Sequence, residues 1–364
     1  LIIISDDFSQ LANNSLSDAI NAQAKVDSRI GKQVTFLVIE NTRVILAPTG
    51  PLNRDYDDVR RYFDAAKLAI NEAKASGSVS PAIYLPNLHT DERYQNALEV
   101  AYLGACQALW QPLEAREYHG EGIEPITQIG LIDASEETVK AVNAIAAGQY
   151  AARDLCGTEP ERMAPPRFAD YCVELFKGSN VSVDVVDDID LIDKNYPMLS
   201  TVARASYAVE RHHPRVVKLE YVPEGEVTRT LMFVGKGLVY DTGGADLKVG
   251  GYMAGMSRDK GGAASVAGFM KAVADYQPKG VKVISYLAVV RNSIGSDCFV
   301  PDEIITSREG VRVRIGNTDA EGRLAMGDLL SEMKDLAKTE VNPTLFTVAT
   351  LTGHAARAMG PYGA

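Results

Sequence analysis

The chain has 364 residues, of which 46% are hydrophobic and 23% charged. This composition is typical of a globular protein of about two domains. The formal net charge is -11 at pH 7, which excludes a general affinity for nucleic acid or anionic membranes, because both attract cations. The four cysteines are widely spaced and form no CxxC pair, so we expect free thiols in a reducing, cytoplasmic location.

The opening segment LIIISDDF does not resemble a targeting sequence. It begins with Leu1 rather than Met and turns acidic after a short apolar run, whereas a signal peptide has a basic flank and a longer apolar stretch. No run in the chain approaches the roughly 18 apolar residues of a membrane-spanning helix. We therefore expect no membrane segment, and a native start upstream of Leu1.

The first part of the chain, residues 1–134, alternates apolar runs with amphipathic stretches. Short apolar runs bounded by turn residues predict strands, and apolar residues at helical spacing predict helices. The expected strands are 33–41, 43–48, 81–87 and 126–133, and the expected helices are 58–76 and 93–113. This order predicts a smaller N-terminal α/β domain.

A single long helix is predicted over residues 135–157. Ser135 is a suitable N-cap with Glu137 in the first turn, and Gly157 ends the helical pattern. Prolines at 160, 165 and 166 prevent the helix from continuing past this glycine. We expect this helix to join the two domains.

Residues 158–364 are predicted to form a second, larger α/β domain. The expected strands are 181–187, 215–223, 230–240, 281–290, 312–317 and 343–351, and the expected helices are 166–178, 261–276 and 324–339. Apolar strands separated by helices indicate a mostly parallel, mixed central sheet that is covered on both faces. Ligands of such sheets bind beyond the carboxyl ends of the strands.

Four acidic residues lie near predicted strand ends. Asp319 and Glu321 in NTDAEGRL are two apart, so on an extended strand end they would project to one side, which Arg323 could share. An isolated DxE is more often a solvated turn, but the surrounding glycine-rich, strand-exit context shifts the balance toward a site. Asp241 directly follows a strand, whereas Asp259 precedes a helix that it could simply cap.

Converging carboxylates predict a metal site, because they would repel one another without cations between them. Two divalent ions about 3.5–4 Å apart are the usual solution, and they support hydrolysis. Oxygen ligands suit magnesium, manganese or zinc. Lys236 and Lys248 flank Asp241 in the sequence; one could ligate a metal as a neutral amine while the other, if charged, stabilises an oxyanion.

Other hydrolytic and nucleotide-binding motifs are absent from the sequence. The five histidines include no HExxH pair, and His354, which follows a predicted strand, is assigned a local structural role. GxxxxGK[ST], GxGxxG before a helix and GxSxG are also missing. A thermolysin-like zinc site, a phosphate-binding loop and a serine hydrolase are therefore disfavoured.

Three segments, VGKGLVYDTGGADLK, MSRDKGGAASV and NTDAEGRL, resemble the leucyl (cytosol) aminopeptidase family. The similarity extends to TEPERMAPPRFAD and HHPRVVKLEY and covers most of residues 140–360. The resemblance implies a metal-dependent aminopeptidase that hydrolyses the N-terminal bond of peptides with a free amino group. It also implies a broad preference for apolar residues such as leucine and a cytoplasmic homohexamer.

The resemblance also assigns roles to individual residues. It implies two metal ions, zinc, manganese or magnesium, with Asp241 and Glu321 bridging them and Lys236 ligating through its amine; the full implied ligand set is Lys236, Asp241, Asp259, Asp319 and Glu321. The implied catalytic residues are Lys248, which polarises the scissile carbonyl, and Arg323, which holds a bicarbonate ion as general base. The implied substrate pocket contains Met256, Thr350, Leu351 and Gly353.

The chain departs from the family pattern in three places. YDTGG replaces the commoner FDSGG, and His354 stands where a small residue is usual. The chain stops at GPYGA, whereas the family continues, so the catalytic domain is expected to lack its C-terminal part. Two alternatives remain: a weakly active or inactive member with a structural or binding role, and a two-metal hydrolase of phosphate esters, which would call for more basic residues.

Overall fold

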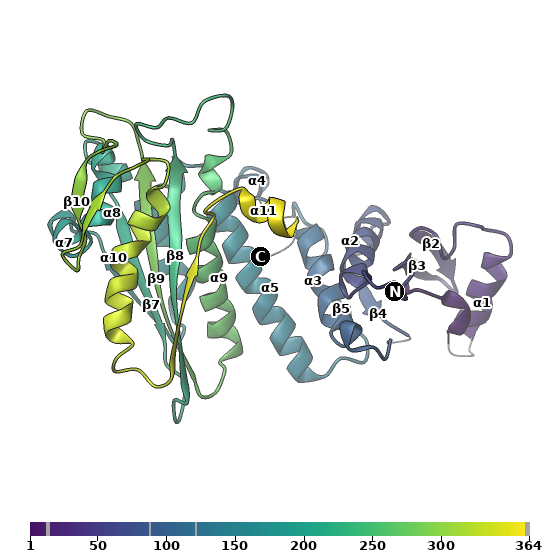
Figure 1. Cartoon of the computed structure of the whole chain (residues 1–364). Helices are drawn as coiled ribbons and strands as arrows, with labels where there is room; N and C mark the ends of the chain where they lie inside the picture. The colour runs from purple at the N-terminus through teal and green to yellow at the C-terminus, as the bar shows by residue number, and fades with distance from the viewer. Residues whose placement is uncertain (12–14, 87–88, 121, 361–364) are drawn as a thin grey trace. The chain divides into compact units, whose positions relative to one another are not determined.

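The computed structural model describes residues 1–11, 15–86, 89–120 and 122–360. It contains two compact units, Leu1–Ala146 and Ala147–Ala364, and the boundary between them falls within α5 (Glu136–Gly157) (Figure 1). The Ser135 hydroxyl accepts a hydrogen bond from the Thr138 N–H at 3.0 Å and so caps this helix. Within the described ranges, no helix is long and apolar enough to cross a membrane.

The first unit is built on a five-stranded sheet in the order β2-β3-β1-β4-β5. Its strands are β1 (Ile2–Ser5), β2 (Thr35–Ile39), β3 (Thr42–Pro48), β4 (Ala82–Tyr84) and β5 (Gly130–Leu131), and its helices are α1 (Ser15–Ala24), α2 (Arg60–Ala75), α3 (Ala97–Leu109) and α4 (Leu113–His119). Only β2 pairs antiparallel among these described strands. The opening apolar run forms the central strand β1, with Ile3 and Ile4 fully buried.

The second unit is built on a mixed five-stranded sheet in the order β12-β8-β9-β7-β6. Its strands are β6 (Val181–Val186), β7 (Arg215–Tyr221), β8 (Arg229–Asp241), β9 (Val281–Asn292) and β12 (Pro343–Val348). The pairs β12/β8 and β8/β9 are parallel, whereas β9/β7 and β7/β6 are antiparallel. The predicted α/β class with a mixed sheet is therefore confirmed, and the parallel part places three strand ends at one edge.

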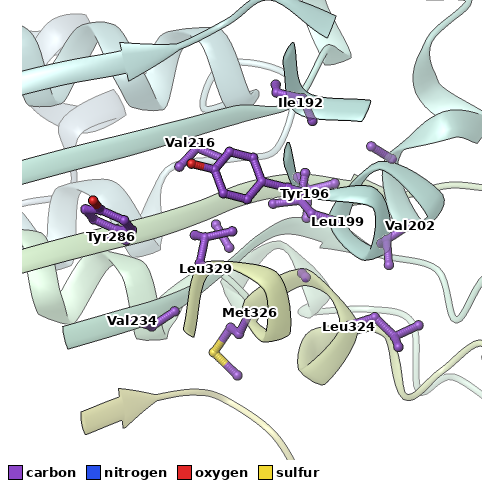
Figure 2. Close-up of a cluster of buried hydrophobic side chains, with 14 of the residues drawn as sticks. Ile192, Tyr196, Leu199, Val202, Val216, Val234, Tyr286, Leu324, Met326 and Leu329 are labelled. Carbon is purple, nitrogen blue, oxygen red and sulfur yellow. The ribbon is translucent and has the colours of Figure 1, made fainter. Parts of the chain in front are cut away.

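Helices cover both faces of this second sheet. The helices of the unit are α6 (Pro165–Phe176), α7 (Ile189–Asn195), α8 (Pro197–Ala203), α9 (Gly261–Tyr276), α10 (Glu321–Leu336) and α11 (His354–Met359). α8 and α10 pack together on one face, and α9 lies on the other (Figure 1). α6 packs beside α9. Figure 2 shows Leu324, Met326 and Leu329 of α10 within the buried cluster of the first face. This packing fixes the start of α10, where Glu321 lies.

Two predicted strands differ from the structure. Residues 312–317 were expected to form a strand of the large sheet, but only Arg312–Arg314 is extended (β11), and it pairs antiparallel with β10 (Ile304–Thr306) in a separate two-stranded sheet. Arg312 and Arg314 are exposed, and such charged side chains disfavour a buried strand. The strand expected over 343–351 ends at Val348, because the chain turns there and brings the Thr350 carbonyl to Lys236.

Candidate metal centre

The strand β8 carries two charged residues in its carboxyl half, and Asp241 is its last residue. Lys236 and Asp241 both lie on β8 and are nearly inaccessible to solvent. Asp241 is paired in register with Asn292, the last residue of β9. The centre is thus at the strand edge where ligands of α/β sheets bind.

A buried cluster surrounds Lys236. Its Nζ lies 2.8 Å from Asp259 Oδ2 and 2.9 Å from Glu321 Oε1, and it donates a hydrogen bond to the Thr350 carbonyl at 3.1 Å. The stem of Lys236 passes so close to Gly322 that a Cβ there would lie 2.6 Å from Lys236 Cε. Gly322 is therefore required for the approach of Lys236 to Glu321.

A second cluster surrounds Lys248. Its Nζ lies 2.9 Å from Asp241 Oδ2 and also forms an ion pair with Asp319. The loop that returns Lys248 to β8 turns at Gly243, whose φ of 89° favours glycine. The Gly243 N–H donates to Asp241 Oδ1 at 2.9 Å, so the turn also orients this carboxylate.

The carboxylates of the two clusters converge. One oxygen from each of Asp241, Asp319 and Glu321 lies within 4.8 Å of the others. The predicted geometry of Asp319 and Glu321 was wrong: they do not share an extended strand, because Asp319 lies in a turn and Glu321 is the first residue of α10. The turn, rather than strand alternation, brings their side chains together.

The donor set fits divalent cations. Glu321 is fully buried, and neither of its carboxylate oxygens accepts a well-aligned hydrogen bond from the described residues. Its carboxylate is instead held by the ion pair with Lys236. A buried carboxylate with free lone pairs is costly unless it is ligated or paired, and several such oxygens at one point match the preferences of magnesium, manganese and zinc.

Burial and mutual charge shift the pKa values in the centre. Burial raises the pKa of Glu321 to about 7 and raises that of Asp259 above its usual range. Burial alone would lower the pKa of Lys236, but the charges of Glu321 and Asp259 outweigh it and raise that pKa. Burial also opposes the charge of Lys248, but its hydrogen bonds to Asp319 and Asp241 outweigh burial and raise its pKa. The carboxylates around each lysine therefore favour its ammonium form.

Asp259 belongs to the centre rather than to a helix cap. The N-cap of α9 is Lys260, and its own side chain makes no capping hydrogen bond. The Asp259 carboxylate instead accepts a hydrogen bond from the Thr350 hydroxyl at 2.7 Å and pairs with Lys236. The capping alternative for Asp259 is therefore wrong.

Comparison with known proteins decides the family. The family model described as "Cytosol aminopeptidase family, catalytic domain" matches residues 150–364, which is more than half of the chain. The chain belongs to the cytosol aminopeptidase family.

Relatives in this family are similar along most of the chain but are longer. "Putative aminopeptidase W07G4.4" of Caenorhabditis elegans is 47% identical over 338 residues, which are 91% of this chain and 64% of the relative. "Probable cytosol aminopeptidase" of Parasynechococcus marenigrum is 32% identical over 87% of this chain and 63% of its own length. The chain thus spans slightly less than two thirds of these relatives.

Solved structures share the fold. The apo leucyl aminopeptidase of Trypanosoma cruzi superposes with a TM-score of 0.81 at 23% identity, covering 99% of this chain and 71% of that protein. The bottromycin maturation enzyme BotP in complex with Mn has a TM-score of 0.79 at 22% identity, covering 99% and 74%. At sequence identities of 22% and 23%, these similarities establish the fold alone.

A cavity of about 650 Å³ is lined by most of the site residues that the sequence predicted. The predicted residues that line it are Lys236, Asp241, Lys248, Met256, Asp259, Asp319, Thr350, Leu351 and Gly353. Glu321 lies buried beside this cavity through its contact with Lys236. Arg323 is exposed and is not among the described residues that line the cavity, so its assignment to bicarbonate stays a prediction. His354 makes a local contact, with its Nδ1 3.0 Å from the Thr352 hydroxyl.

One residue of the centre was not predicted. Asn292 is fully buried, and its amide donates to Asp241 Oδ1 at 2.8 Å and to the Thr318 carbonyl at 3.2 Å. It therefore ties the end of β8 to the turn that carries Asp319. The available signal was a polar residue at the end of an apolar strand, at the edge where ligands bind.

Replacing Asn292 by alanine is expected to weaken metal binding about 10- to 100-fold, because partners that orient metal ligands typically contribute that much. Calorimetric titration of the apo protein with Mn²⁺ measures the change. Asn180→Ala, at an exposed position in the same unit, is the matched control. Equal affinities in wild type and Asn292→Ala would show that the Asp241 contact does not support ligation.

Proposed function

We propose that the chain carries the catalytic centre of a metal-dependent aminopeptidase that removes the first residue of peptides with a free amino group. The observation that carries this proposal is the convergence of Asp241, Asp319 and Glu321 within 4.8 Å at the sheet edge, next to two lysines in a sizeable cavity. Family membership agrees with this chemistry.

Five residues would hold the metal ions in this proposal: Lys236, Asp241, Asp259, Asp319 and Glu321. When bound, two divalent ions of zinc, manganese or magnesium would supply Lewis acidity for hydrolysis of the peptide bond. Glu321 pairs with Lys236 and Asp241 pairs with Lys248, yet one oxygen of each carboxylate lies within 4.8 Å of the other, which would suit the pair to bridge the ions. Lys236 would take part through its amine after losing its proton.

Lys248 is the group proposed to act on the substrate carbonyl. Its side chain lines the cavity and keeps its charge through Asp241 and Asp319. A fixed ammonium beside the reacting carbon stabilises the negative charge that develops on the carbonyl oxygen. Asp241 and Asp319 hold this ammonium in place.

The cavity wall favours apolar first residues. Met256, Leu351 and Gly353 line it with Thr350. Each methylene buried in an apolar pocket discriminates by only about 1–3 kcal/mol, so the proposed preference for leucine is broad. On family resemblance, the proposal includes a cytoplasmic homohexamer.

The decisive experiment measures release of ammonia from leucinamide and from N-acetyl-leucinamide by the full-length protein. Activity on the free amine alone, lost on chelation and restored by Zn²⁺ or Mn²⁺, is the expected result. Hydrolysis of a phosphate ester such as p-nitrophenyl phosphate in place of the amide would favour the phosphate-ester alternative. No hydrolysis by protein with both metals bound would favour a structural or binding role.

A further inference from the structure

The cations that line the cavity are not all neutralised. Lys236 and Lys248 each pair with two carboxylates of the centre. Arg258 also lines the cavity, is exposed, and forms no ion pair with any described carboxylate. Its guanidinium is thus available to an anionic group of a bound molecule.

The backbone beneath Arg258 is held firmly. Arg258 ends the short 3-10 helix η5 (Met256–Arg258), where its N–H donates to the Gly255 carbonyl at 3.1 Å. Its own carbonyl accepts from Cys156 Sγ at 3.7 Å. The Arg258 main chain is therefore fixed to α5 on one side and to the loop before η5 on the other.

Lys260 strengthens this anchoring. Its side chain is fully buried, and its Nζ donates to the Ser257 carbonyl and, at 3.0 Å, to the Thr158 carbonyl just after α5. A buried ammonium is costly, and a cation at the start of α9 opposes the helix dipole. The Thr158 carbonyl near the end of α5, where cations are favoured, and the Ser257 carbonyl of η5 compensate for these costs. The backbone of η5, next to Asp259, is therefore held by contacts from Cys156 and Lys260.

We propose that Arg258 binds a carboxylate of the substrate, so that the cavity favours peptides with an anionic group close to the scissile bond. The guanidinium fork matches the two oxygens of a carboxylate, which lysine does not. The backbone contacts keep the base of this side chain next to Asp259 and limit the region that the guanidinium can reach. This inference rests on the proposed aminopeptidase function and specifies its substrate class.

Three sources could provide this carboxylate: an acidic first side chain, an acidic second side chain, or the terminal carboxylate of a dipeptide. Three pairs of matched substrates separate them. Asp-Gly-amide is compared with Asn-Gly-amide, Leu-Asp-amide with Leu-Asn-amide, and Leu-Gly with Leu-Gly-amide. Each pair differs by one carboxylate at nearly constant shape.

We expect the metal-loaded wild type to cleave the acidic member of at least one pair with a kcat/KM up to about five-fold higher, the upper end of the range for one exposed ion pair. In Arg258→Gln this ratio should fall to about one, mainly through KM, and Arg258→Lys should recover part of it. Arg357→Gln removes an exposed arginine that does not line the cavity, and it should keep the wild-type ratio. The responding pair identifies the source of the carboxylate.

Two results would overturn the inference. One is a wild-type ratio of one or less in all three pairs, and the other is an unchanged ratio in Arg258→Gln. Failure of the proposed function is distinct, because then neither member of any pair is cleaved. Calorimetric binding of the same peptides would in that case still show whether Arg258 selects the acidic member.

Discussion

Replacement of Lys248 by methionine is expected to lower kcat for leucinamide by about 10²- to 10³-fold, the usual effect of removing one oxyanion-stabilising donor. Methionine keeps most of the stem length while removing the ammonium that faces Asp241 and Asp319. KM should change little, because the lost interaction strengthens only as charge develops on the carbonyl oxygen. Steady-state kinetics of the metal-loaded protein measure both constants.

Metal binding distinguishes this role from ligation. Removing a positive charge from beside two carboxylates makes the centre more attractive to cations, so Lys248→Met should bind Mn²⁺ at least as tightly as wild type. Lys271→Met, which removes a lysine that pairs with Asp275 on α9, serves as the control and should keep wild-type kcat. A Lys248→Met protein with full metal content and unchanged kcat would rule out the assigned role.

The location of the centre could be predicted because its residues lie in segments with strong patterns. The apolar runs before Asp241 and after Asp259 predicted a strand and a helix that the structure contains as β8 and α9. Since parallel strands end at one edge, their flanking residues were expected near one another. Lys236 and Lys248 could be placed at the same edge because they flank Asp241 in the sequence.

Side-chain geometry was less predictable, because it depends on which element begins next. The pair Asp319 and Glu321 suggested strand alternation, yet α10 begins at Glu321. Asn292 could not be assigned without the β8/β9 register, which places it opposite Asp241. The central role of β1 was equally hidden, since four apolar residues at a chain start do not indicate whether neighbouring strands cover them.

Replacement of Glu321 by glutamine is expected to weaken metal binding by at least about 100-fold, because loss of an orienting partner alone costs 10- to 100-fold and Glu321 is a proposed ligand. Glutamine keeps the shape of the buried side chain, and Lys236 retains its ion pair with Asp259. The fold of the apo protein should therefore persist. Burial disfavours the charged form of Glu321 and raises its pKa to about 7, so replacing this carboxylate with a neutral amide removes a costly buried charge.

Thermal unfolding with and without Mn²⁺ separates ligation from folding. A ligand at 100 times its Kd stabilises the native state by about 2.7 kcal/mol, so wild type should show a clear metal-dependent rise in Tm. Glu321→Gln should lose most of that rise while its apo Tm stays close to wild type. Glu224→Gln, at an exposed position, should behave as wild type. A full metal-dependent rise in Glu321→Gln would mean that the buried carboxylate serves Lys236 alone, and the proposed bridging role would be wrong.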